Sequence, residues 1–277
     1  FQAEDGIRDR SPSRGLGDVY KRQELNKSSR SVARESKVYE IGRDVVAAKK
    51  QNKGPDIWLA GDPADLEKWM PFGIAGVVTN TVVLNQMVNK YGHIKDVTQR
   101  YLDITDKPVV IEIDGSTSED LIKTADYFCE ISDRIIIKVP CSVESLAVFN
   151  ELDRRGVDTY CTTVFSLPQA AAVAQAGAKH ILPFCEPVRE IGGDPTKLVR
   201  ECVDMFNGWE KRPYITAALV RSVETAHLAL RDGADGIIIF WNVYEEMLSH
   251  PLTDQWNEIF LGEWNQMKQG GMLEGSV

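Results

Sequence analysis

Short runs of apolar, often β-branched residues alternate along this chain with longer segments in which apolar residues recur every three or four positions. Runs of the first kind are typical of buried strands, and segments of the second kind are typical of amphipathic helices. Their alternation predicts parallel strands joined by crossover helices. The candidate strands are Ile57–Ala60, Ala75–Thr79, Val109–Ile113, Ile135–Val139, Thr159–Val164, His180–Phe184, Tyr214–Ala218 and Gly236–Phe240.

About eight such units are the number that closes a barrel, so we predict an α/β fold formed by a single (β/α)8 TIM barrel. An N-terminal helical extension and an extra C-terminal helix complete the expected architecture. The alternative is an open doubly wound sheet, which would place a glycine-rich phosphate turn after its first strand. The sequence there is Leu59-Ala60-Gly61-Asp62-Pro63, which has no Gly-x-Gly-x-x-Gly motif.

The same patterns suggest where the parts of the chain begin and end. Residues 1–23 show no periodicity and resemble a translated read-through more than a native segment, so we expect them to be disordered. Residues 24–54 form the predicted helical extension, residues 55–268 the barrel with its last helix, and residues 269–277 a flexible tail. In that last helix, we expect Trp256, Phe260 and Trp264 to pack one face on the barrel.

Composition limits the classes of function. The chain of 277 residues has a formal net charge of -9 and a sequence pI near 5.1, which argues against a nucleic-acid partner. Its five cysteines are scattered without a Cys-x-x-Cys pair, as expected of reduced thiols. No apolar run approaches a membrane span, and we see no apolar signal-peptide core. We therefore expect a cytoplasmic protein that does not contact a membrane.

Candidate chemistry lies at the ends of neighbouring strands. Lys138 ends a β-branched run, while Glu112 and Thr162 end the strands on either side. Because the C-terminal ends of barrel strands converge, these three side chains can share one cavity. A buried lysine driven toward the neutral amine can form a Schiff base with a ketone. A single lysine at a strand end is more often solvated or salt-bridged, so its neighbours carry the argument. We expect Glu112 to act through a water molecule and not as a tight ion pair.

Metal-dependent aldol chemistry is the rival mechanism, because a divalent ion can stabilise an enediolate. The four histidines lie on separate predicted elements, which does not favour a clustered metal site. Acidic residues near two strand ends offer Mg²⁺ ligands, but that arrangement leaves Lys138 without a role. We predict no metal and no cofactor.

Three motifs resemble the transaldolase and fructose 6-phosphate aldolase family of Schiff-base barrels. They are IIIKVP around Lys138, TYCTTVFSLPQAAAVAQAGA around Thr162, and AGVVTNTVVL around Thr79 and Asn80. The resemblance spans most of the chain from about Pro55. It implies that Lys138 forms the Schiff base and that Thr79 and Asn80 contact a sugar or sugar phosphate. It also implies a homo-oligomer clasped by the terminal helix.

Two positions favour transfer over simple aldol cleavage. In this family, transaldolases carry glutamate and phenylalanine where the fructose 6-phosphate aldolases carry glutamine and tyrosine, and this chain has Glu112 and Phe184. The resemblance thus implies transfer of a dihydroxyacetone unit from a ketose to an aldehyde. The alternatives are a carbon-carbon lyase similar to fructose 6-phosphate aldolase or to sulfofructose transaldolase. A catalytically silent barrel that binds a sugar phosphate or a protein is a third possibility.

Three departures from the family pattern concern the substrate. The usual first-strand aspartate is absent at Leu59 and Ala60, so Asp62 in the following loop is the candidate replacement. The arginine expected after the sixth strand is also absent, and Arg189 is the nearest substitute. The phosphate-binding serine of the seventh strand appears as Leu219, although the basic Arg221 persists. The substrate therefore carries a phosphate held differently, a sulfonate, or no anion.

Overall fold

The computed structural model describes residues 54–272 of the chain. The predictions for residues 1–23 and for the helical extension up to residue 53 lie outside the described residues. The described residues belong to one compact unit.

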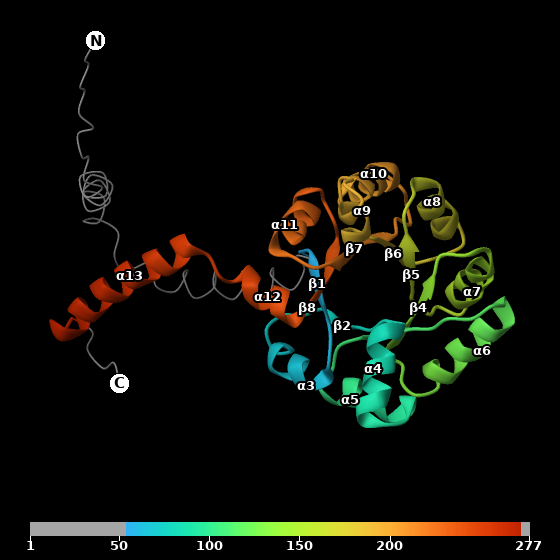
Figure 1. The fold of residues 1–277 in the computed structure, drawn as a ribbon, viewed down its shortest axis with the longest axis horizontal. Helices are drawn as coiled ribbons and strands as arrows, with labels where there is room; N and C mark the ends of the chain where they lie inside the picture. The colour runs from blue at the N-terminus through green and yellow to red at the C-terminus, as the bar shows by residue number, and fades with distance from the viewer. Residues whose placement is uncertain (1–53, 273–277) are drawn as a thin grey trace, which may run out of the picture. The chain divides into compact units, whose positions relative to one another are not determined.

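Eight parallel strands close into a barrel, with β1 paired to both β2 and β8 (Figure 1). The closed ring confirms the predicted (β/α)8 fold and excludes the open sheet. Predicted and observed strands agree to within two residues at either end. The strands are β1 Asp56–Ala60, β2 Gly76–Val78, β3 Val109–Glu112, β4 Ile135–Pro140, β5 Thr159–Val164, β6 His180–Pro183, β7 Tyr214–Val220 and β8 Gly236–Phe240.

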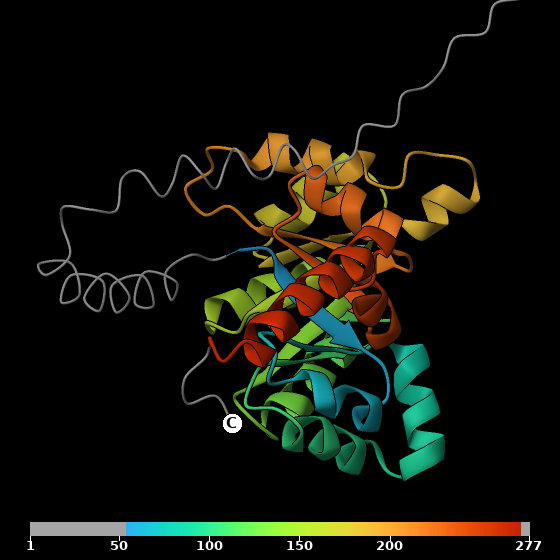
Figure 2. The same ribbon diagram turned by 90° about the vertical axis from the view of Figure 1, so that its left-hand side faces the viewer.

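Helices surround this ring of strands, as the view along the barrel and the side view both show (Figures 1 and 2). Most of the longer ones begin at a side chain that accepts a hydrogen bond from the first turn, such as Thr117, Ser142 or Ser222. The helices are α3 Pro63–Leu66, α4 Thr81–Tyr91, α5 Ile94–Asp103, α6 Ser118–Cys129, α7 Val143–Arg154, α8 Leu167–Gln175, α9 Glu186–Glu190, α10 Lys197–Phe206, α11 Val223–Arg231, α12 Trp241–Met247 and α13 Pro251–Gln269, with a short 3-10 turn at Glu67–Trp69.

Two apolar layers hold the barrel together. The larger lies between the outward faces of the strands and the helices, and the smaller fills the barrel interior with inward-pointing side chains. In the smaller layer the Trp58 and Tyr160 rings meet edge to face at 5.6 Å, and Tyr160 stacks on His180 at 3.9 Å. A cavity opens beyond this filled interior, near the C-terminal ends of the strands.

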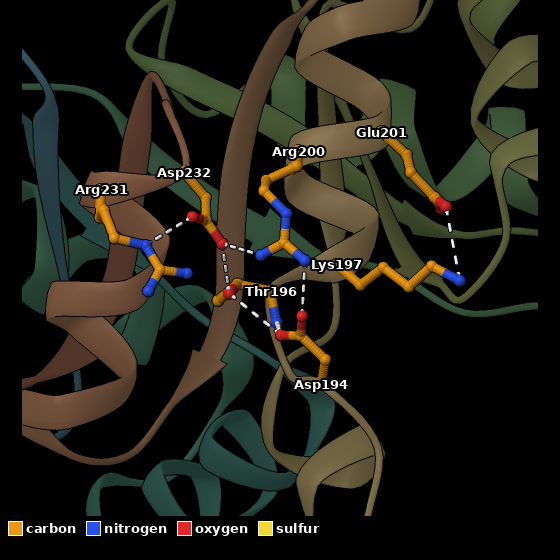
Figure 3. Close-up of polar contacts among 7 residues, drawn as sticks. All are labelled: Asp194, Thr196, Lys197, Arg200, Glu201, Arg231 and Asp232. Atoms are coloured by element: carbon orange, nitrogen blue, oxygen red, sulfur yellow. Dashed lines mark hydrogen bonds and ion pairs between the residues drawn. The ribbon is translucent and has the colours of Figure 1, made fainter.

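A polar cluster joins the segment before α10 to the end of α11 (Figure 3). At its centre is the carboxylate of Asp232, whose side chain is only 4% exposed. It accepts hydrogen bonds from Thr196 Oγ1 at 2.6 Å, from Arg231 Nε at 2.8 Å and from Arg200. Arg200 also pairs with Asp194 at 2.5 Å. None of these residues lines the cavity described below.

Helix α13 buries no side chain against the rest of the described chain. Trp256 is 43% exposed, Phe260 62% and Trp264 44%. The prediction that these rings pack on the barrel is therefore wrong. The helix itself forms as its pattern predicts, because Pro251 stands at its start and His250 Nδ1 accepts a hydrogen bond from Leu252 N at 3.1 Å.

Candidate active site

A cavity of about 390 Å³ opens at the C-terminal ends of the barrel strands. This is the end where barrel enzymes carry their chemistry, because eight strand ends and their loops meet there. Of the residues expected to form a site, Glu112, Lys138, Thr162, Thr79, Asn80, Phe184 and Arg221 line this cavity. The first three come from consecutive strands, as predicted.

Lys138 and Glu112 form a direct ion pair, with Lys138 Nζ 2.9 Å from Glu112 Oε2. The two residues are register partners on β4 and β3, so both side chains point into the barrel at the same level. Their side chains are 6% and 11% exposed. The expectation that a water molecule separates them is therefore wrong, because the register leaves no room between two side chains on adjacent strands.

The environment of Lys138 favours its neutral form. Burial lowers the pKa of the ammonium, since it removes the water that solvates the charge, and the carboxylate of Glu112 offsets part of this effect. The net effect is that the pKa of Lys138 is lowered. Transfer of a proton from Lys138 to Glu112 across this contact of 2.9 Å gives a neutral amine without a change in the net charge of the pair.

Thr162 presents a hydroxyl group that has no hydrogen-bond partner among the described residues. Its side chain is 1% exposed and lines the cavity. The next residue, Thr163, has a φ of 56°, which is rare for a β-branched residue, and it lies where the register of β5 with β6 shifts. An orphaned hydroxyl beside strained backbone is typical of a functional site, because a substrate can supply the missing partner.

Thr79 and Asn80 follow β2 and have different tasks. The hydroxyl of Thr79 donates to Val110 O at 3.0 Å and accepts from Glu112 N at 3.2 Å, so it fixes the backbone that carries the carboxylate. Asn80 Oδ1 accepts from Val83 N at 2.7 Å and caps α4. Because the oxygen of this amide faces the helix, its NH₂ group is left to donate elsewhere.

Two further predicted residues line the cavity after β6 and β7. The ring of Phe184 packs edge to face on Phe165 at 5.4 Å. Arg221 is 57% exposed at its side chain, and its Nη1 lies 3.6 Å from Glu190 Oε1. It is a solvated arginine with a carboxylate beside it.

The structure places Asp62 and Arg189 outside the cavity lining. The carboxylate of Asp62 accepts hydrogen bonds from Ala64 N at 3.0 Å, Tyr91 Oη at 2.7 Å and Lys90 Nζ at 2.5 Å, so it caps α3 and ties α3 to α4. Arg189 pairs with Glu224 and donates to Thr225 Oγ1 at 3.0 Å, so it ties α9 to α11. The structure therefore does not bring these two residues together with the other predicted site residues.

Sequence reasoning missed an apolar wall on the other side of the cavity. It comprises Ala60 on β1, Ala218 and Leu219 on β7, and Ile238 and Phe240 on β8. Alternate residues of a barrel strand point inward, so the sequence of β8 already indicated which of its residues face the barrel interior. Apolar residues of this kind do not stand out as candidates for chemistry. Gln86 of α4 also lines the cavity and was not predicted.

Within residues 54–272, no group of three or more histidine, cysteine, aspartate or glutamate side chains is placed to hold a metal ion. None of the helices in this part of the chain is long and apolar enough to cross a membrane.

Comparison with known proteins identifies the family. The sequence profile of the Transaldolase/Fructose-6-phosphate aldolase family matches residues 61–273. A protein named "Probable transaldolase" from Aquifex aeolicus is 30% identical over 206 residues, which cover 74% of this chain and 94% of that protein. "Probable transaldolase 1" from Listeria monocytogenes is 32% identical, covering 71% and 90%. "Probable transaldolase" from Methanococcus maripaludis is 28% identical, covering 73% and 95%. This chain therefore belongs to the transaldolase/fructose-6-phosphate aldolase family of enzymes.

Proposed function

We propose that this protein transfers a dihydroxyacetone unit from a ketose donor to an aldehyde acceptor through a Schiff base on Lys138. The observation that carries the proposal is the buried contact of 2.9 Å between Lys138 Nζ and Glu112 Oε2, inside the cavity at the strand ends. Family membership supports aldolase-type transfer, and the pair supplies both the amine and the proton carrier that such a transfer requires.

The proposed reaction begins when Glu112 takes the proton of the Lys138 ammonium. The free amine attacks the ketone carbon and forms a carbinolamine, and Glu112 returns the proton so that the hydroxyl leaves as water. The resulting iminium withdraws electrons from the neighbouring carbon-carbon bond. A base removes the proton of the adjacent hydroxyl, the bond breaks, and the first aldehyde leaves while an enamine remains on Lys138.

In the second half of the cycle the enamine carbon attacks an acceptor aldehyde, whose oxygen takes a proton. Water then adds to the new iminium, and the product ketose leaves as Lys138 regains its amine. In this scheme the hydroxyl of Thr162 holds the water that is lost and regained. The NH₂ group of Asn80 donates to substrate hydroxyls, Thr79 positions Glu112, and Phe184 packs on the bound sugar.

A lyase of the same mechanism remains the competing proposal. Transfer requires the enamine to survive until an acceptor arrives, whereas a lyase protonates it and releases dihydroxyacetone. Phe184 lies where the related aldolases carry a tyrosine, and its ring has no hydroxyl to donate that proton. Measuring free dihydroxyacetone with and without an acceptor aldehyde separates the two, since only a lyase releases it at full rate without an acceptor.

Borohydride trapping tests the proposed Schiff base. The full chain is incubated with a ketose and borohydride, and the modified peptide is mapped by mass spectrometry. We expect a ketose-dependent adduct on Lys138, and none in a Lys138→Met variant. A matched control is Lys179→Met, which removes an exposed lysine just before β6 and should leave the adduct unchanged. Adducts spread over surface lysines, with none on Lys138, would contradict the mechanism.

We also propose that α13 mediates a homo-oligomer. Its apolar side chains, Leu252, Trp256, Ile259, Phe260, Leu261 and Trp264, are all at least 43% exposed in the single chain. A helix with this much uncovered apolar surface is stabilised by a partner surface. Light scattering of the full chain should give a multiple of the chain mass, and Phe260→Asp with Trp264→Asp should lower it. A monomeric wild-type protein would contradict this proposal.

A further inference from the structure

We infer that the ketose accepted by this site carries no phosphate or sulfonate, and that its end distant from the carbonyl is a neutral and partly deoxygenated carbon chain. This inference rests on the proposed function, because it assumes that the ketone carbon reaches Lys138. It concerns the substrate class, which the reaction mechanism alone leaves open.

The wall of the cavity that faces Lys138 is apolar. In a ring of eight strands β8 lies opposite β4, and β8 contributes Ile238 and Phe240 to the cavity. The neighbouring strands add Ala60 from β1 and Ala218 and Leu219 from β7. None of these five side chains has a group that can donate a hydrogen bond. A substrate that extends from Lys138 across the barrel therefore meets methyl and aromatic groups.

Among the described residues, the cavity lining also holds no buried, unpaired cation for an anionic substrate. The cationic side chains in its lining are Lys138 and Arg221. The charge of Lys138 is balanced by Glu112 at 2.9 Å, and Arg221 is 57% exposed with Glu190 at 3.6 Å. A phosphate dianion placed here would lose hydration without gaining a buried counter-charge, and Glu112 would repel it.

Helix α4, which begins at this end of the cavity, has one N–H group of its first turn already paired. An uncapped helix N-terminus is a common anion site, because its free N–H groups point at the ligand. In α4 one of these groups is already paired, since Asn80 Oδ1 accepts from Val83 N at 2.7 Å, so fewer N–H groups are left for a ligand.

We assign to Leu219 the selection of the distal substituent, which is the group at the end of the ketose distant from its carbonyl. It has a φ of 51° and lies where the register of β7 with β8 shifts between Ala217 and Val220. A leucine in the left-handed region costs about 1 kcal/mol or more relative to glycine or asparagine. An apolar side chain held in strained backbone on the cavity lining is consistent with a contact that selects the substrate.

Three ketoses that differ only at carbon 6 test the inference: 6-deoxyfructose, fructose and fructose 6-phosphate. With one acceptor aldehyde, we expect kcat/KM to fall in that order, by about tenfold at each step. Borohydride adducts on Lys138 should follow the same order. Equal or higher kcat/KM for fructose 6-phosphate would overturn the inference while leaving the Schiff-base mechanism intact. If no ketose forms an adduct on Lys138, the proposed function fails and this inference fails with it.

A variant of Leu219 sharpens the test. Leu219→Asn is nearly isosteric and suits the positive φ, so the variant should fold, and it presents an amide to the distal substituent. We expect its preference for 6-deoxyfructose over fructose to fall at least about threefold, while the Leu219→Met control keeps the preference within about twofold. Because the preference is a ratio within one sample, it does not depend on the active fraction. An unchanged ratio in Leu219→Asn would remove Leu219 from substrate selection.

Discussion

Lys138 in the cavity and Asp232 between α10 and α11 are both buried charged side chains, but they differ in the number of their partners. Asp232 accepts three side-chain hydrogen bonds, from Thr196, Arg200 and Arg231. Among the described residues Lys138 pairs with Glu112 alone, although an ammonium can donate three hydrogen bonds. The two side chains are thus buried to a similar degree, but the charge of Asp232 has more polar partners than the charge of Lys138.

The pKa values move in the directions that this difference predicts. Burial raises the pKa of Asp232, but the hydrogen bonds from Arg231, Thr196 and Arg200 outweigh it and lower the pKa to about 2. Burial lowers the pKa of Lys138, and Glu112 recovers only part of the loss. The charge of Asp232 is therefore stabilised, whereas that of Lys138 is destabilised. A well-compensated buried charge supports the fold, and a poorly compensated one is available for chemistry.

The largest effect is expected from Lys138→Arg. Arginine keeps the positive charge beside Glu112 but stays protonated at any working pH, so it cannot supply a free amine. We expect kcat to fall on the order of 10⁴-fold or more. Steady-state transfer assays measure this, with a thermal unfolding curve to show that the variant is folded. Substantial remaining turnover in a folded variant would mean that the charge of Lys138, and not its neutral amine, matters.

Replacing Glu112 by glutamine should have the next largest effect. The shuttle of protons is lost, so we expect kcat to fall about 10²- to 10⁴-fold. Glu112 raises the pKa of Lys138, so its removal should lower that pKa further. The rise of kcat/KM with pH that reports the free amine should therefore shift to lower pH, and a shift to higher pH would contradict the assigned coupling.

Asp232→Asn should affect stability and leave catalysis alone. The substitution removes the negative charge that faces Arg200 and Arg231, and it turns an acceptor into a donor. We expect the free energy of unfolding to fall by about 2 kcal/mol, with kcat unchanged in the folded protein. Asp194→Asn is the matched control, because that side chain is 44% exposed, and it should lose less than about 1 kcal/mol. Denaturant titration of both variants measures the difference.

The smallest expected effect is the dependence on acid pH of the difference in unfolding free energy between the wild type and Asp232→Asn. The pKa of Asp232 is depressed from the usual 3.8 to about 2, so its contribution is present above about pH 3.8 and is lost as the pH falls toward about 2. The contribution is at most about 2 kcal/mol, because Arg200 and Arg231 are partly solvated. Urea titrations of wild type and Asp232→Asn should converge as the pH falls through this window. If the difference in unfolding free energy did not change with pH, the contribution of Asp232 to stability would come from packing and not from its charge.

Much of the site could be predicted because the barrel converts sequence order into spatial proximity. The run that ends at Lys138, and the strands before and after it, predicted that Glu112 and Thr162 would share a cavity with the lysine. The direct contact between Lys138 and Glu112 could not be predicted, because it depends on strand register. Asp62 and Arg189 lie beyond strand ends, where a shift of a few residues turns a side chain from the cavity to a neighbouring helix.

By itself, the sequence determined the fold class, the order of the strands and the residues that carry the amine, the carboxylate and the hydroxyl. These follow from local periodicity and from the rule that parallel barrel strands end on one side. Only the tertiary structure decided that Lys138 and Glu112 touch, that an apolar wall faces them, and that the apolar side chains of α13 stay exposed. Each of these depends on contacts between residues distant in sequence, whose distances are set by register and packing and not by any local pattern.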